Sequence, residues 1–94
     1  MTADGEARFT SVSSDAVLVR AAQKGSSQAF TVLVERYHAP VLRYLTRQLG
    51  SAELAEDLVQ ETFLDAYRSL RQLDERRAFA AWLYQIARNN LRHA

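Results

Sequence analysis

The chain has 94 residues, a formal net charge of +1, 48% hydrophobic residues and no cysteine. This length is typical of one domain, and the lack of cysteine excludes disulfides and thiolate metal sites. The chain has only three glycines and one proline, and its abundant Ala, Leu, Arg, Glu and Gln favour helix. We therefore expect an all-α fold, a compact four-helix bundle that occupies residues 14 to 94.

The first 13 residues, MTADGEARFTSVS, are mostly small and polar and show no helical periodicity. They predict a flexible N-terminal tail over residues 1 to 13. This stretch lacks the basic start and apolar run of a secretion signal, and no apolar run in the chain approaches the ~18 residues of a membrane span. We expect a soluble, cytoplasmic protein with no membrane insertion.

Two helices are predicted in the first half of the chain. Ser14 or Asp15 can cap a short first helix, which ends at Gly25, a residue that favours the left-handed turn after a helix. Ser26 or Ser27 can cap a longer second helix, in which apolar residues recur at spacings of three and four.

Two residues limit the second helix. Gly50 predicts its end, and Pro40 lies inside its apolar pattern. Proline lacks a backbone N–H and crowds the preceding turn. We therefore expect a kink or break near residues 37–39.

The third helix is predicted from a cap at Ser51 to about Leu70. Its expected core stripe is Val59, Phe63, Ala66, Tyr67 and Leu70, and its outer arc is Asp57, Gln60, Glu61, Asp65 and Arg68. Leu64 falls inside that outer arc. An apolar side chain among acids has the composition of an interface anchor, although single exposed leucines are common on solvated surfaces. The residues alone leave both interpretations open.

The segment RQLDERR lacks periodicity and predicts a loop, and AFAAWLYQIARNNLRHA predicts a fourth helix. The helix's expected core side is Phe79, Trp82, Leu83, Ile86, Ala87 and Asn90, and its outer side is Ala81, Gln85, Arg88 and Arg92. Tyr84 and Leu91 fall outside the core arc, where they can meet a partner. The loop arginines together with Arg88, Asn89 and Arg92 can neutralise phosphates and hydrogen-bond base edges, and a solvated basic face is the alternative.

Nothing in the sequence favours catalysis. There is no glycine-rich phosphate loop, and His38 and His93 lack motif partners. The acids of the third helix have no histidine at the spacing of a carboxylate metal site in a bundle. We expect no enzyme activity, no metal and no cofactor, and we interpret His38 as a surface or kink residue.

Acidic and basic residues are segregated along the chain. Residues 53 to 65 hold five acids and no base, whereas residues 71 to 94 hold five arginines and two acids. Opposite charges on separate segments suggest two different partners.

Three stretches, VLVRAAQKGSSQAFTVLVERY, AEDLVQETFLDAYRSL and AFAAWLYQIARNN, occur in this order with short gaps. Together they resemble region 2 of bacterial RNA polymerase sigma factors of the sigma-70 family, in particular the extracytoplasmic-function (ECF) group. The resemblance runs from Ala16 to about Arg92. It implies a transcription initiation factor domain that works without a cofactor.

The resemblance implies a partner for the acidic face. The family helix that matches residues 55 to 67 docks on the coiled coil of the RNA polymerase β′ subunit. Its candidate contacts here are Asp57, Gln60, Glu61 and Leu64.

The resemblance also implies that the loop from Arg71 to Ala78 and the fourth helix bind the minus-ten promoter element. They would trap a base flipped out of the non-template strand. Leu73 stands where relatives often carry an aromatic residue, and Asn89 matches a position associated with promoter contact. The candidate DNA-binding residues are Arg71, Leu73, Arg76, Arg77, Arg88, Asn89 and Arg92. Of these, Arg76, Arg77, Arg88 and Arg92 are similar to backbone contacts.

Full-length relatives carry a second domain, region 4, which reads the minus-35 element. This chain ends at Ala94 before any such domain, so we expect a fragment or an isolated domain. An anti-sigma factor is a further partner that the family implies. The alternative function is a helical protein-interaction module that does not bind DNA.

Overall fold

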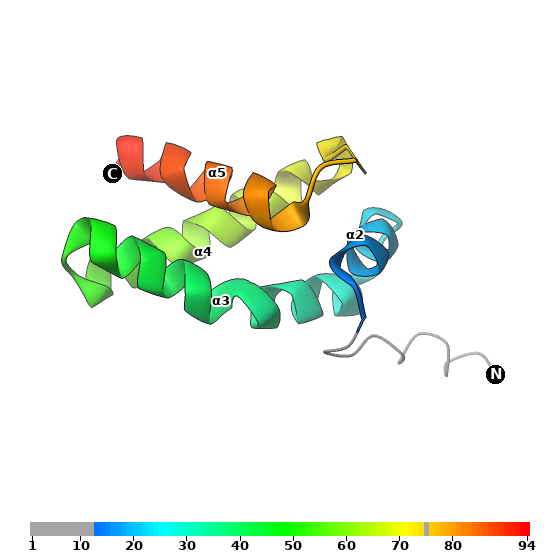
Figure 1. The fold of residues 1–94 in the computed structure, drawn as a ribbon, viewed down its shortest axis with the longest axis horizontal. Helices are drawn as coiled ribbons and strands as arrows, with labels where there is room; N and C mark the ends of the chain where they lie inside the picture. Colours follow the sequence, from blue (N-terminus) through cyan, green and yellow to red (C-terminus); the bar gives the residue numbers. More distant parts are fainter. Residues whose placement is uncertain (1–12, 75) are drawn as a thin grey trace.

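The computed structural model describes residues 13–74 and 76–94. Over these residues it contains α2 (Asp15–Gln23), α3 (Ser27–Leu49), α4 (Ala52–Ser69), the short 3-10 helix η1 (Leu70–Gln72) and α5 (Phe79–Arg92). Figure 1 shows that α3, α4 and α5 run along the length of the molecule, and α2 lies at the end where α4 connects to α5. The predicted all-α fold with four helices is confirmed.

The helix ends follow the predicted capping residues. Ser14, Ser26 and Ser51 each accept a hydrogen bond from the backbone N–H three residues later, at 3.2, 3.1 and 3.2 Å. Gly25 and Gly50 follow α2 and α3 with φ of 109° and 70°, a conformation that glycine adopts without strain. Each turn therefore has a local cause in the sequence.

Pro40 does not break the second helix, so the expected break is wrong. Residues 27–49 form one helix that contains Pro40. Proline removes one backbone hydrogen bond, but Leu33 before it and Val41 and Leu45 after it are fully buried in the same core. Packing on both sides holds the helix together, because tertiary contacts contribute more to helix stability than one internal bond.

The core lies between all four helices and contains one polar residue among those described. Its largest fully buried side chains are Leu18, Leu33, Leu45, Leu83, Val41, Val59 and Thr62. The hydroxyl of Thr62 accepts from Asn90 Nδ2 at 3.3 Å, and the same nitrogen donates to Asp65 Oδ2 at 3.2 Å. Asn90, predicted on the core side of the fourth helix, is therefore a polar link between α5 and α4.

Three predicted side-chain positions are wrong. Tyr67, predicted in the core stripe, is 58% exposed because it lies at the border of that stripe, edge-on to Phe30 at 5.1 Å. Tyr84 and Leu91, predicted to face outward, are partly buried against the core. Tyr84 meets Tyr44 edge-on at 5.4 Å, since α5 packs on α3 as well as on α4.

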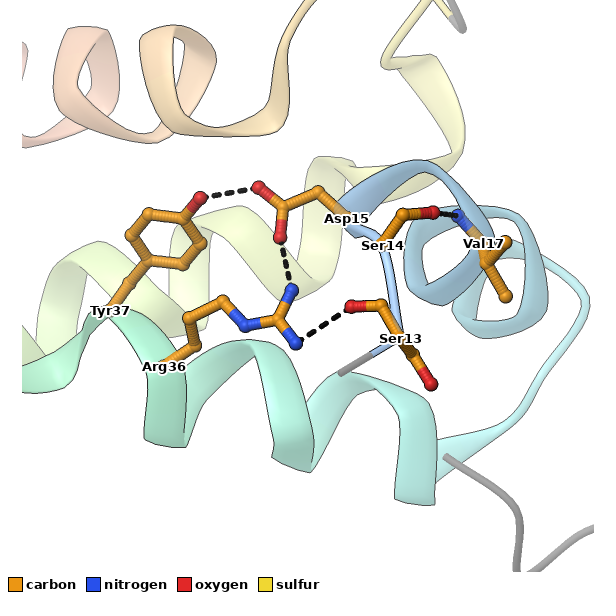
Figure 2. Close-up of polar contacts among 6 residues, drawn as sticks. All are labelled: Ser13, Ser14, Asp15, Val17, Arg36 and Tyr37. Carbon is orange, nitrogen blue, oxygen red and sulfur yellow. Dashed lines mark hydrogen bonds and ion pairs between the residues drawn. The ribbon is translucent and has the colours of Figure 1, made fainter. Parts of the chain in front are cut away.

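A polar cluster fastens the start of α2 to α3 (Figure 2). Asp15 accepts hydrogen bonds from the Arg36 guanidinium at 2.6 Å and from the Tyr37 hydroxyl. Arg36 also donates to the Ser13 carbonyl at 2.7 Å. Burial, together with the hydrogen bond to the Asp15 carboxylate, raises the pKa of Tyr37 to about 12. Of the predicted flexible tail, Ser13 is thus held by Arg36, and residues 1–12 lie outside the described residues.

No helix among the described residues is long and apolar enough to cross a membrane.

Candidate functional site

The outer face of α4 carries the four predicted polymerase contacts. Asp57, Gln60, Glu61 and Leu64 recur at spacings of three and four, which places them on one side of the helix. All four are exposed, and Leu64 exposes 52% of its surface. The structure therefore brings these four residues together at the surface.

Leu64 borders an apolar groove. A groove of about 480 Å³ lies between α3 and α4, lined by Phe30, Val34, His38, Val59, Gln60, Phe63, Leu64 and Tyr67. Two of the four predicted contacts, Gln60 and Leu64, are among its lining residues. An incoming apolar side chain would find a concave surface here rather than a single leucine, and concave apolar sites with a few polar groups are typical binding sites.

His38 has a place in this groove that sequence analysis missed. Its ring stacks on Phe63, with centroids 6.5 Å apart and planes 10° from parallel. Phe30, Val34 and His38 are spaced by four residues on α3, which puts them on one side of that helix. That spacing was the available signal, and the interpretation of His38 as a surface or kink residue overlooked it.

The predicted acidic arc divides into two parts. Asp57 and Glu61 are exposed, whereas Asp65 is half-buried against α5, accepts from Asn90 and lies 3.6 Å from the Arg68 guanidinium. Glu53 and Glu56 are also exposed, one turn earlier. The acids available to a partner therefore lie toward the N-terminal half of α4.

On α5, the predicted residues Arg88, Asn89 and Arg92 are all exposed. A loop residue joins them, because the Arg77 guanidinium donates to Gln85 Oε1 on α5 at 2.8 Å. Gln85 precedes Arg88 and Asn89 by three and four residues, so Arg77 lies on the same face of the helix. Arg77 thus links the loop to the basic side of α5.

Arg76 is held by its own loop. Asp74 accepts from the backbone N–H of Arg76 at 2.8 Å and from its guanidinium at 2.9 and 3.2 Å. These hydrogen bonds, with the side chain contributing most, lower the pKa of Asp74 and keep it charged. The pair partly neutralises Arg76, so the predicted phosphate contact of Arg76 would require its release from Asp74.

A pocket of about 360 Å³ lies where the loop meets α2. Its lining comprises Asp15, Ala16, Val19, Arg20, Gln23, Leu73, Arg76, Arg77, Ala78 and Phe79. Leu73, predicted as a DNA contact, is only 5% exposed and belongs to the core. It contributes to this pocket as a wall.

Arg71 does not join the other predicted DNA contacts. It lines a separate cavity of about 330 Å³ beside the turn between α2 and α3, together with Arg68. The structure therefore groups Leu73, Arg76 and Arg77 around one pocket and Arg88, Asn89 and Arg92 along α5, and leaves Arg71 apart.

Sequence analysis also missed the part that α2 plays in the pocket. Ala16, Val19, Arg20 and Gln23 all line it. They follow spacings of three and four, so the sequence showed that they share a face of α2. It did not show that this face meets a loop some 50 residues later in the chain. Figure 1 shows that meeting at one end of the molecule.

Comparison with known proteins assigns the fold to a family. The sequence profile of Sigma-70 region 2 matches residues 33–94. The chain belongs to the sigma-70 region 2 family. The resemblance drawn from its three motifs is therefore confirmed.

Curated relatives of this region 2 domain are named ECF RNA polymerase sigma-E factor. The protein from Haemophilus influenzae is 40% identical over 79 residues, which cover 84% of this chain and 41% of the relative. The protein from Escherichia coli K12 is 42% identical over the same shares of the two chains. The chain thus spans less than half the length of the curated relatives that it matches.

Two solved structures share the fold. An engineered region 2 of sigmaE, in complex with GTAAAA, is 40% identical, with a TM-score of 0.81 over 90% of this chain and 88% of that one. CnrH in complex with the cytosolic domain of CnrY is 35% identical, with a TM-score of 0.75 over 84% of this chain and 51% of that one. The compact four-helix region 2 fold is thereby confirmed.

Proposed function

We propose that this region 2 domain acts in transcription initiation as part of an ECF-type sigma factor. It would bind RNA polymerase through α4, and melted promoter DNA through α5 and the loop of residues 73–78 between η1 and α5 (the 73–78 loop). The observation that carries this proposal is the match over 90% of the chain to a sigmaE region 2 whose structure is a complex with GTAAAA. With these partners the domain would act in the cytoplasm and would carry out no catalytic step.

The polymerase partner that we propose is the coiled coil of the β′ subunit. Leu64 would lose its water on docking and fill space beside the α3–α4 groove. Asp57 and Glu61 flank it and would pair with basic side chains of the coiled coil, which fixes the register of docking. Apolar burial with charged pairs at its edge supports a specific interface.

The DNA partner that we propose is the non-template strand of the minus-ten element. Flipping a base out of the stack costs a few kcal/mol, which a pocket must return through shape and hydrogen bonds. The pocket between α2 and the loop, with Arg76 and Arg77 among its lining residues, is the site for such a base. Arg88 and Arg92 would neutralise phosphates along α5, and Asn89 would hydrogen-bond a base edge.

A regulatory protein is a further proposed partner. CnrH, a structural neighbour, is in complex with the cytosolic domain of CnrY. An anti-sigma segment that placed apolar side chains in the groove between α3 and α4 would cover Leu64 and Gln60. It would then compete directly with polymerase, so one substitution at Leu64 should weaken the binding of both partners.

The test of the proposed function is fluorescence anisotropy with labelled single-stranded oligonucleotides. The panel carries every single substitution in a minus-ten element, and each oligonucleotide is titrated with this chain, with and without the β′ coiled coil. The proposal requires preference for one sequence together with affinity for the coiled coil. Coiled-coil binding with equal affinity for every oligonucleotide would favour the protein-interaction module without DNA recognition.

A further inference from the structure

Gln23, in the last turn of α2, bridges two carbonyl groups that lie 47 and 50 residues later in the chain. Its Nε2 donates to the Leu70 carbonyl at 2.9 Å and to the Leu73 carbonyl at 3.0 Å. Carbonyl oxygens only accept hydrogen bonds, so the amide nitrogen and not the amide oxygen must face them. Both N–H bonds of that nitrogen are thereby used on one short segment.

The segment that Gln23 holds is the start of the 73–78 loop. The η1 helix, Leu70–Gln72, is a single 3-10 turn, a form with poor hydrogen-bond geometry that rarely extends further. Its closing bond runs from the Leu73 N–H to the Leu70 carbonyl at 3.0 Å. Gln23 therefore ties both ends of this turn to α2 and adds two bonds to the one that the turn makes itself.

The tie bears on the pocket, because Gln23 and Leu73 both line it. Arg76 and Arg77 follow Leu73 within four residues and line the same pocket. A change in the direction of the chain at Leu73 would move both guanidinium groups relative to α2. Gln23 itself lies outside residues 33–94, which the family profile matches.

We propose that Gln23 is a positioning residue for DNA sequence preference: its bridge to residues 70 and 73 sets the shape of the pocket that receives the flipped base. Gln23 acts through the loop backbone and needs no contact with DNA. The inference rests on the proposed function of the loop.

Two substitutions with side chains of similar length separate the effect of the two hydrogen bonds from the effect of replacing glutamine. Gln23→Met keeps most of the volume and removes both donors. Gln23→Lys also removes the amide but supplies an ammonium group, which can donate to both carbonyls. Gln28→Met is the matched control, because Gln28 is an exposed glutamine on α3 that does not line the pocket.

The measured quantity is the affinity ratio between the preferred oligonucleotide and its single-base variants, for the whole 94-residue chain. We expect Gln23→Met to lower this ratio about three- to tenfold, the effect of losing up to two hydrogen bonds, and to leave affinity for core RNA polymerase unchanged. Gln23→Lys should keep the ratio while raising affinity for all oligonucleotides alike, and Gln28→Met should change nothing. The proposal is overturned if Gln23→Met leaves the ratio unchanged, including the case in which it lowers the affinity for every oligonucleotide equally. It is also overturned if Gln23→Lys lowers the ratio as Gln23→Met does.

Amide hydrogen exchange distinguishes failure of this inference from failure of the proposed function. The Leu73 and Arg77 amides donate to the Leu70 and Asp74 carbonyls and report loop order without DNA. They should exchange faster in Gln23→Met than in Gln23→Lys. If the parent chain shows no preference among oligonucleotides, the proposed function fails. If the two variants show equal amide exchange, the Gln23 bridge does not order the loop and this inference fails, whatever the oligonucleotides show.

Discussion

The two proposed binding faces of this domain are built in different ways. The polymerase face takes its four contacts from one helix, between Asp57 and Leu64. The DNA face is assembled from α2, the loop and α5, so that Asp15 and Phe79 line one pocket. A face on one helix is specified by local periodicity. A composite face exists only once the whole bundle has packed.

The two faces also differ in how their charges are held. Within the described residues, Asp57 and Glu61 have no ion pair or hydrogen bond from another side chain. By contrast, Arg76 is paired with Asp74 and Arg77 with Gln85. The acidic face is thus ready for a basic partner, whereas in the proposed complex the loop would exchange internal contacts for contacts to DNA. We expect polymerase docking to proceed without rearrangement and DNA binding to involve a change in the loop.

The largest effect is expected at the polymerase face. Leu64→Ala should weaken binding to core RNA polymerase by about 1–3 kcal/mol, because it removes the apolar anchor beside the groove. Leu54→Ala is the matched control, since Leu54 is 56% exposed on the same helix but does not line the groove. Affinities are measured by titration with core polymerase. Equal affinities of the two variants would show that Leu64 contributes no more to binding than an exposed leucine outside the groove.

The DNA face can be tested with two adjacent asparagines. Asn89 is exposed, whereas Asn90 is bonded to Thr62 and Asp65 in the interior. Asn89→Ala should reduce the preference for one minus-ten sequence by about 1–2 kcal/mol and leave stability unchanged. Asn90→Ala should lower the free energy of unfolding by about 1 kcal/mol and leave the preference unchanged. Urea unfolding and the oligonucleotide panel distinguish the two roles, and a preference unaltered in Asn89→Ala contradicts base reading.

A smaller effect is expected from the arginines of α5. Arg88→Ala should weaken binding to all oligonucleotides alike and reduce the slope of log affinity against log salt by about 0.7, the value for one phosphate contact on a single strand. Arg71→Ala should change the slope less, because Arg71 lies beside the α2–α3 turn, apart from the α5 residues. Equal slopes for the two variants would show that Arg71 also contacts a phosphate.

The contrast between the faces also explains what could be predicted from the sequence. The caps at Ser14, Ser26 and Ser51 and the exposure of Leu64 follow from residue type and helical spacing. The burial of Leu73 and the half-burial of Tyr84 depend on which helix packs above them, and spacing within one helix cannot give that. The pocket needs both α2 and the loop, so no single segment of the sequence could reveal it.

The last effect concerns how α2 is fastened beside the pocket, and it appears only in alkali. The pKa of Tyr37 is raised from 10.0 to about 12, so its neutral form contributes stability that is fully present below pH 10. That stability is lost as the pH rises from 10 to 12. The free energy of unfolding should therefore fall more steeply over this window in the parent chain than in Tyr37→Phe, measured by urea unfolding at each pH. Tyr37 also packs on Phe79, with ring centroids 5.5 Å apart, and Phe79 lines the pocket. Parallel slopes for the two chains would mean that the pKa of Tyr37 is not raised in the folded chain, so that neither its burial nor its hydrogen bond to Asp15 favours the neutral form there.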